Sequence, residues 1–134
     1  MRIRPAKISD IDNIMRMYKS CVNGMIEENI DQWDDTYPNK DIIIKDIVNK
    51  THYIYILNNT IVGGINIDSI QDKTYLDIKW DDTEDKYLVV HRLGIRKEYW
   101  NKGIGRKLML FTESLVLEKK LNSIRLETYS NNPI

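Results

Sequence analysis

The stretch from Tyr87 to Tyr129 constrains the fold more than any other part of the sequence. Tyr87 to Ile95 is the most apolar strand pattern of the chain, and an amphipathic helix pattern follows from near Gly103 to about Lys120. Ser123 to Tyr129 then alternates like a strand. Such a strand–helix–strand unit places its two strands side by side and parallel, with a right-handed crossover.

The first half of the chain predicts two helices and an antiparallel hairpin. A short strand at residues 2–4 leads into a helix capped by Ser9, and a second helix starts near Pro38. The segments 52–57 and 60–67 read as paired strands joined by the tight turn Asn58–Asn59, and residues 74–80 alternate as a further strand. We therefore predict one mixed α/β domain over residues 1–134, with a mostly antiparallel sheet.

Composition narrows the class of protein. A chain of 134 residues suits one domain, and no run approaches the ~20 apolar residues of a membrane helix. The amino terminus is too polar for a signal peptide, and Cys21 has no second cysteine to pair with, so we expect a soluble, cytoplasmic protein in which Cys21 is a core thiol. Gly63–Gly64, within the second hairpin strand, indicates a bulge or a close approach of another segment.

The net charge of zero is a cancellation of two unequal halves. Residues 92–134 carry nine basic and four acidic side chains, a balance of +5, so residues 1–91 carry −5. This is either ordinary scatter of surface charge or a site with an anion at one end and a cation at the other. Overall neutrality and the lack of a basic, aromatic face argue against nucleic-acid binding.

A basic turn with two glycines opens the helix of the strand–helix–strand unit. Glycines let successive N–H groups point at one place, and the unpaired N–H groups at a helix start favour an anion. The turn is either a phosphate cradle or only a tight helix entry. It lacks the lysine spacing of the P-loop and the six-position dinucleotide fingerprint, so those two nucleotide-binding classes are disfavoured.

In this segment the sequence resembles the GNAT superfamily of acyl-CoA-dependent N-acyltransferases. Leu93-Gly94-Ile95 stands where the family has its Leu-x-Val-like triplet, and residues 100–105 stand where it has Gln/Arg-x-x-Gly-x-Gly/Ala. Trp100 replaces the usual Gln or Arg. The resemblance implies an enzyme with acetyl-CoA as cosubstrate and no metal, which transfers an acetyl group to a primary amine of a small molecule or peptide by direct attack in a ternary complex.

The resemblance also implies the site residues. A bulge in the triplet strand would aim an N–H at the thioester carbonyl, and Gly94 would suit it. The pyrophosphate would lie on the turn. The residues implied in cofactor binding are Leu93, Gly94, Ile95, Trp100, Asn101, Lys102, Gly103, Ile104, Gly105, Arg106 and Asn132.

A base must remove the amine proton, because an alkylammonium group has a pKa near 10 (about 10.4 for lysine). His91, two residues before Leu93, is expected on the same strand face, and Glu127 on the neighbouring parallel strand is the next candidate. Each is otherwise a packed or ion-paired residue.

Acceptor binding is expected between the first two helices, from an aromatic, acidic segment: Trp33, Asp34, Asp35 and Tyr37. Trp33 is alternatively a buried anchor for the loop.

Relative to the family pattern, the chain is expected to lack a helix and two strands after Asn132. The alternative function is therefore a non-catalytic acyl-CoA-binding or self-associating module. The exposed last strand would permit a homodimer in that case.

Overall fold

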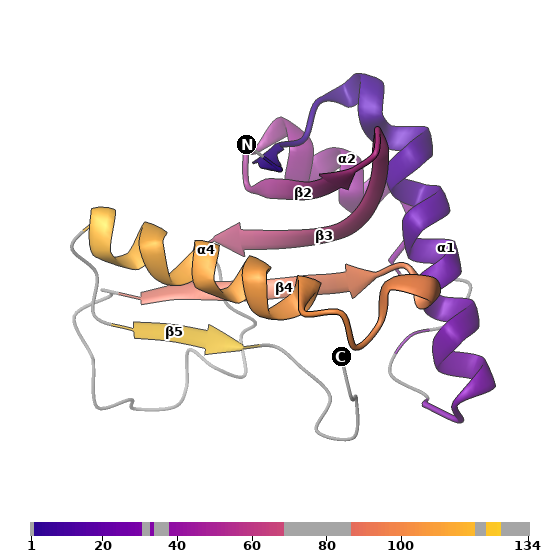
Figure 1. The fold of residues 1–134 in the computed structure, drawn as a ribbon. Coiled ribbons are helices and arrows are strands. Elements are labelled where there is room, and N and C mark those ends of the chain that lie inside the picture. Colours follow the sequence, from indigo (N-terminus) through magenta and orange to yellow (C-terminus); the bar gives the residue numbers. More distant parts are fainter. Residues whose placement is uncertain (1, 31–32, 34–37, 69–86, 120–122, 127–134) are drawn as a thin grey trace, which may run out of the picture.

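The computed structural model describes residues 2–30, 33, 38–68, 87–119 and 123–126, and places five strands in one sheet with helices on both faces (Figure 1). The strand order follows the chain, β1-β2-β3-β4-β5. The first four strands pair antiparallel, and β4 pairs with β5 in parallel. The predicted mixed α/β class and the parallel strand–helix–strand unit are therefore confirmed.

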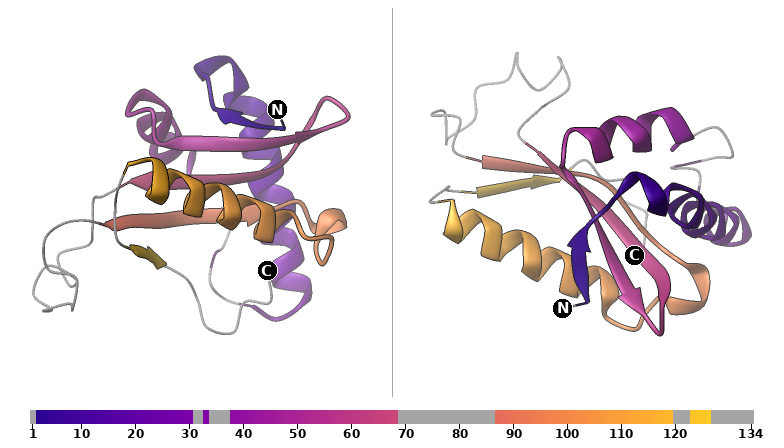
Figure 2. Two further views of the ribbon diagram at one scale, coloured as in Figure 1. Left: turned by 60° about the vertical axis from the view of Figure 1, so that its left-hand side comes forward. Right: turned by 90° about the horizontal axis from the view of Figure 1, so that it is seen from above.

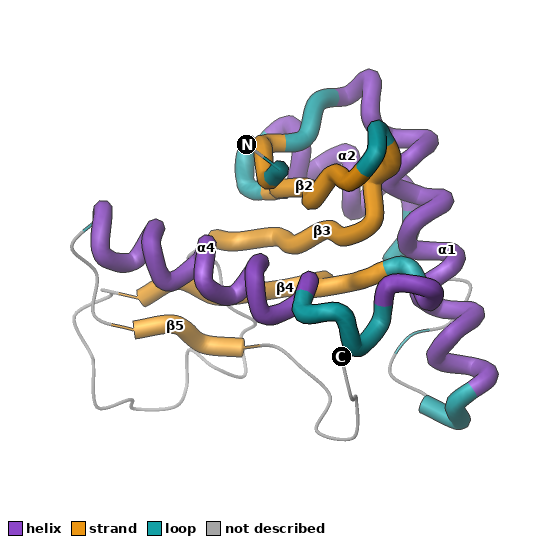
Figure 3. Tube along the Cα trace, in the orientation of Figure 1, coloured by secondary structure: helices purple, strands orange, loops and turns teal. Residues whose placement is uncertain are grey.

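The elements lie close to the predicted ranges (Figure 3). The strands are β1 Ile3–Pro5, β2 His52–Leu57, β3 Thr60–Asp68, β4 Tyr87–Ile95 and β5 Ser123–Leu126. The helices are α1 Ile11–Glu27, α2 Lys40–Val48 and α4 Ile104–Glu118, with short 3-10 turns η1 Ile8–Asp10 and η2 Lys97–Tyr99. The predicted strand at 74–80 lies outside the described residues.

The first helix begins two residues after its predicted cap, Ser9, because Ile8–Asp10 forms a 3-10 turn. In this turn the Asp10 carboxylate accepts a hydrogen bond from the Lys7 N–H and a bidentate pair from the Arg4 guanidinium. The second helix begins at Lys40, since Asn39 caps it by accepting the Ile42 N–H at 2.9 Å.

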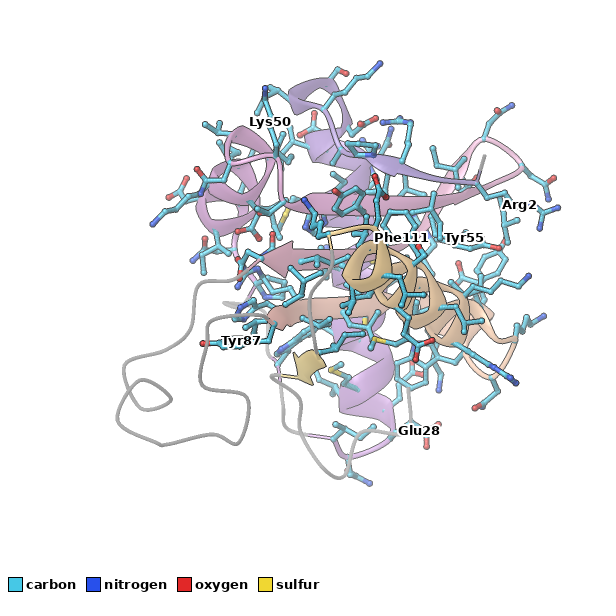
Figure 4. The ribbon with its side chains drawn as sticks, turned by 90° about the vertical axis from the view of Figure 1, so that its left-hand side faces the viewer. Arg2, Glu28, Lys50, Tyr55, Tyr87 and Phe111 are labelled. Carbon is cyan, nitrogen blue, oxygen red and sulfur yellow. The ribbon has the colours of Figure 1, made fainter. Side chains whose placement is uncertain are left out.

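The two faces of the sheet have separate apolar cores. Helices α1 and α2 cover one face and α4 covers the other (Figure 2). On the α4 side, Phe111 packs against the cluster that contains Tyr55, and its ring meets the Tyr53 ring edge-on at 5.0 Å (Figure 4). Within the described residues, no helix is both long and apolar enough to cross a membrane.

Both predictions for the hairpin are confirmed. Asn58 and Asn59 have φ of 49° and 61°, the left-handed conformation that a two-residue hairpin turn of type I′ requires at both positions. The register between β2 and β3 shifts beside Gly63, and a Cβ on Gly64 would lie 2.8 Å from the Met17 Cε. The glycine pair therefore combines a bulge with a close approach of α1.

Asn59→Gly and Asn59→Ala test the turn. Glycine adopts positive φ without cost, whereas alanine loses about 1 kcal/mol or more in the left-handed region. We expect the glycine variant to unfold at higher urea concentration than the alanine variant, by about 1 kcal/mol in the free energy of unfolding. Equal stability of the two variants would contradict the assigned turn.

Candidate functional site

Strand β4 contains one residue more than its partner β3 at the centre of the sheet. Gly64 pairs with Gly94 but Asn66 pairs with His91, so Ile65 alone faces both Arg92 and Leu93. Arg92 has a φ of 52°, which non-glycine residues rarely adopt. This is a β-bulge, and it lies one to two residues before Gly94, the residue at which the family resemblance placed the expected bulge.

The bulge breaks the alternation of side chains along β4. Leu93 packs with the apolar cluster beneath α4, whereas the side chain of His91 bonds to Asp68 on the α1 and α2 side. The prediction that His91 and Leu93 share a face is therefore wrong, because the extra residue shifts every side chain after it by one position.

Gly94 is required for packing rather than for the bulge. A Cβ at this position would lie 2.7 Å from Cε1 of Tyr18 and 3.2 Å from Cζ3 of Trp33. The missing side chain lets the Tyr18 ring lie directly against β4. Tyr18 and Trp33 meet edge-on with ring centroids 5.8 Å apart.

Arg92 is held by two helices. The Asp46 carboxylate of α2 accepts two hydrogen bonds from its guanidinium, at 2.6 Å from Nε and 2.7 Å from Nη2. The Tyr18 hydroxyl of α1 donates to its carbonyl oxygen at 2.5 Å. Asp46 is buried, and burial raises the pKa of its carboxyl while Arg92 opposes that rise.

His91 ends a chain of polar side chains on the same face. Its Nε2 lies 3.1 Å from Oδ1 of Asp68, and Asn66 donates to Oδ2 of Asp68 at 2.7 Å. Thr51 in turn donates to the Asn66 side-chain oxygen at 2.5 Å. A carboxylate held in this way orients the imidazole and stabilises its protonated form.

His52 is a fully buried titratable group on the same face. Its Nε2 lies 3.5 Å from the Tyr18 hydroxyl, and its Nδ1 lies 4.0 Å from Oδ2 of Asp46 and has no hydrogen-bond partner. Burial, with a smaller contribution from the Arg92 charge, lowers the pKa of His52 to about 3. His52 is therefore neutral near pH 7.

Within the described residues, the parallel pairing of β4 and β5 extends to just before the bulge. The last pair in register is Val90 with Leu126, whereas β4 continues to Ile95. The first turn of α4 lies near this carboxyl end of β4 (Figure 1). The described residues of β5 thus leave the bulged part of β4 without a neighbour strand on that side.

The turn before α4 has the geometry of an anion site. Asn101 and Gly103 both have positive φ, 62° and 81°, and the first helical hydrogen bond is from the Lys107 N–H to the Gly103 carbonyl. The N–H groups of the first turn have no acceptor within the helix. No described residue lies within 4 Å of a Cβ at Gly103, so these residues leave the space beside the turn open.

The basic side chains between Arg92 and Lys107 have separate roles. Arg92 binds Asp46, Arg96 donates to the Ile61 carbonyl at 2.8 Å, and Lys97 binds Glu28 at 2.9 Å. Lys102 and Arg106 are exposed and make no ion pair within the described part of the chain. Lys107, in the first turn of α4, is exposed in the same way, so three basic side chains near the turn remain for an anionic ligand.

Trp100 fixes the turn to the rest of the domain. Its indole N–H donates to the Ile95 carbonyl at 2.8 Å, and the Lys97 ammonium lies 4.2 Å from its ring centroid. The ring also lies against Gly24 of α1. The side chain that replaces the family's Gln or Arg is thus used in packing, and a cofactor contact at this position would come from the backbone.

Two further predicted residues lie in the core. Cys21 is fully buried, and burial raises the pKa of its thiol to about 11, with the Ile95 backbone opposing. Trp33 is 7% exposed, the buried position that the sequence left open as the alternative. Its acceptor contact stays a prediction. The predicted site residues outside the described part are Asp34, Asp35, Tyr37, Glu127 and Asn132.

Sequence reasoning missed the polar residues Tyr18, Asp46, His52, Asn66 and Asp68 as parts of one site. They come from four elements, and no local spacing joins them. A signal existed for Asp46, because it follows Ile43 by three residues and so falls on the buried face of α2. Within the described residues, no three His, Cys, Asp or Glu side chains are grouped so that they could hold a metal ion.

The comparisons with known proteins agree on one family. The model of the acetyltransferase (GNAT) family matches residues 13–134. None of the curated proteins matches the chain.

Several solved structures share the fold. A GNAT-family acetyltransferase from Streptococcus agalactiae 2603 is 25% identical with a TM-score of 0.80, over 97% of this chain and 76% of that one. A protein of Staphylococcus aureus Mu50 assigned to the acetyltransferases is 28% identical with a TM-score of 0.75, over 92% and 77%. The PaiA N-acetyltransferase of Thermoplasma acidophilum, solved with coenzyme A, is 20% identical with a TM-score of 0.73, over 97% and 80%. This last likeness is one of fold.

The neutral, buried His52 predicts a pH dependence of stability. Its pKa is about 3 in the folded state against about 6.5 unfolded, so the unfolded state binds the extra proton. The stabilisation is complete above pH 6.5 and is lost as the pH falls toward 3. From pH 6 to pH 5 we expect the free energy of unfolding, measured with guanidinium, to fall by about 1 kcal/mol less in His52→Gln than in the wild type. Parallel curves would contradict the assignment.

Proposed function

Because the chain belongs to the acetyltransferase (GNAT) family, we propose that it transfers an acetyl group from acetyl-CoA to a primary amine of a small molecule or peptide, by direct attack in a ternary complex. The observation that carries the proposal is the bulge at Arg92 and Leu93, which lies on the strand that leads into the anion-binding turn. An acyl-CoA bound along β4 would bring its thioester to the bulge and its pyrophosphate to the turn.

The turn supports the binding of the cosubstrate. Its left-handed residues and the free N–H groups of α4 suit a pyrophosphate, and the exposed Lys102 and Arg106 add positive charge. The open space at Gly103 leaves room for the phosphates. The backbone alone is proposed to bind the phosphates at Asn101, Ile104 and Gly105. A contact from Asn132, which the family pattern includes, stays a prediction.

The bulge supports stabilisation of the tetrahedral intermediate. The Tyr18 hydroxyl holds the Arg92 carbonyl toward α1, and in a planar trans peptide the next N–H points the opposite way. The Leu93 N–H therefore points away from Tyr18 and from the sheet face that α1 covers. This N–H is the donor that we assign to the oxygen of the thioester carbonyl, where negative charge develops.

His91 is the group we assign to the amine proton. As the amine nitrogen forms its bond to the acetyl carbon, His91 accepts the proton, and Asp68 stabilises the resulting imidazolium. The carbon–sulfur bond then breaks, and solvent supplies the proton taken up by the CoA thiolate. Glu127 is the second candidate for the base.

Acceptor binding is proposed at the segment that contains Trp33. Its acidic residues Asp34 and Asp35 would attract a cationic amine, and Tyr37 would add an aromatic face. The buried Trp33 supports this proposal only as an anchor, because it packs against Tyr18 next to β4. The acceptor would thereby lie close to the bulge.

Binding of acetyl-CoA tests the turn. We expect the wild type to bind acetyl-CoA with a micromolar Kd in calorimetry, and the double variant Gly103→Glu with Gly105→Glu to lose binding by about a hundredfold or more, because two carboxylates face the pyrophosphate. The control is Ser114→Glu, which adds a carboxylate to an exposed position further along the same helix.

A folded wild type without micromolar binding would refute the cosubstrate. Equal losses in Ser114→Glu would show that the charge acts at a distance and that the turn is not the site. Binding without turnover over a panel of amines would favour the non-catalytic module over the enzyme.

His91→Gln and Asp68→Asn test the base. Because Gln cannot take a proton, we expect kcat to fall by about a hundredfold with the Kd for acetyl-CoA unchanged. Asp68→Asn removes the charge that stabilises the imidazolium, so His91 should lose its proton at lower pH and the kcat–pH profile should move to lower pH values. The profile of the wild type and of Asp68→Asn is measured with one amine from pH 5 to 9. An unchanged kcat in His91→Gln would remove His91 from the reaction and leave Glu127.

A further inference from the structure

Arg92 is the point at which two helices hold β4. Its side chain is bound by Asp46 from α2 in a bidentate pair, and its carbonyl is bound by Tyr18 from α1. One contact holds the side chain and the other holds the backbone of the same residue. Neither helix is near Arg92 in sequence, so both contacts are tertiary.

The residue between these contacts has an unfavourable backbone conformation. Arg92 has a φ of 52°, in the left-handed region that a non-glycine residue adopts only at an energetic cost. A glycine would adopt it freely, as Gly103 does in the turn before α4. The conformation therefore persists because other interactions hold it.

The two contacts fit the function of holding the bulge. A bidentate arginine–carboxylate pair restricts the guanidinium in two directions, and Asp46 and Arg92 are both largely shielded from water, with 9% and 13% of their side-chain surface exposed. The Tyr18 ring is buried and lies against Gly94, so its hydroxyl is held next to β4. The orientation of the Arg92–Leu93 peptide is set by this hydroxyl.

We propose that Tyr18 and Asp46 are positioning residues that clamp Arg92 in its left-handed conformation and thereby aim the Leu93 N–H at the thioester carbonyl. The inference rests on the proposed acyl transfer for the role of that N–H. The clamp acts on the backbone of β4 and does not require a bound cosubstrate.

The first test removes the tyrosine hydroxyl. We expect Tyr18→Phe to lower kcat by about tenfold, because the N–H is misaligned in the transition state, with the Kd for acetyl-CoA unchanged. In infrared difference spectra, the carbonyl stretch of bound, 13C-labelled acetyl-CoA should move toward its value in water. The matched control is Tyr53→Phe, which removes a tyrosine hydroxyl on the opposite face of the sheet.

The second test removes the ion pair and then the strain. Asp46→Asn should lower kcat in the same way, whereas Asp10→Asn, which breaks the bidentate pair with Arg4 remote from β4, should not. The double variant Asp46→Asn with Arg92→Gly should recover most of the lost kcat, since glycine adopts positive φ without a clamp. Asp46→Asn with Arg92→Ala should not recover it.

A backbone measurement separates the clamp from the enzyme. The 13Cα and 13Cβ chemical shifts of Arg92 report a left-handed residue, and we expect them to change in Tyr18→Phe and Asp46→Asn but not in the controls. Unchanged shifts, or equal kcat in the glycine and alanine double variants, would overturn the clamp. Shifts that change as expected in a protein without turnover would leave the clamp standing and refute the proposed function.

Discussion

The β-bulge at Arg92 and Leu93 is the constraint on which the arrangement of the site depends. One extra residue in β4 puts His91, which faces α1 and α2, and Leu93, which faces α4, on opposite faces of the sheet. The last described pair between β4 and β5, Val90 with Leu126, precedes the bulge. A regular strand would place the two side chains on one face.

The bulge is stabilised by contacts with both helices on one face of the sheet. Gly94 and Gly64 bring α1 close to the strands, so that the Tyr18 ring and hydroxyl reach β4. The buried pair of Asp46 and Arg92 joins α2 to the same residue. Because a buried charge left without its partner is costly, the ion pair holds the strand in one register as well as stabilising it. The domain thus uses its two amino-terminal helices to shape a strand that follows them by some forty residues or more.

Local pattern predicted most of the fold, because the hairpin, the helix of α4 and the ranges of β2 and β4 depend on periodicity and turn residues close in sequence. The bulge could not be predicted, since an arginine at positive φ has no signature in the sequence. Gly94 was expected to suit the bulge, whereas it is required because the Tyr18 ring packs against it. The charge balance was similarly coarse. Arg92, Arg96 and Lys97 are bound to other parts of the protein, whereas Lys102, Arg106 and Lys107 are exposed at or beside the turn.

A crystal structure of the chain with acetyl-CoA tests the central claim most directly. The account predicts the thioester carbonyl oxygen within hydrogen-bond distance of the Leu93 N–H, Arg92 still at positive φ, and the pyrophosphate on the N–H groups between Asn101 and Arg106. A cosubstrate bound elsewhere on the molecule, or a β4 that binds it as a regular strand without the bulge, would contradict the account.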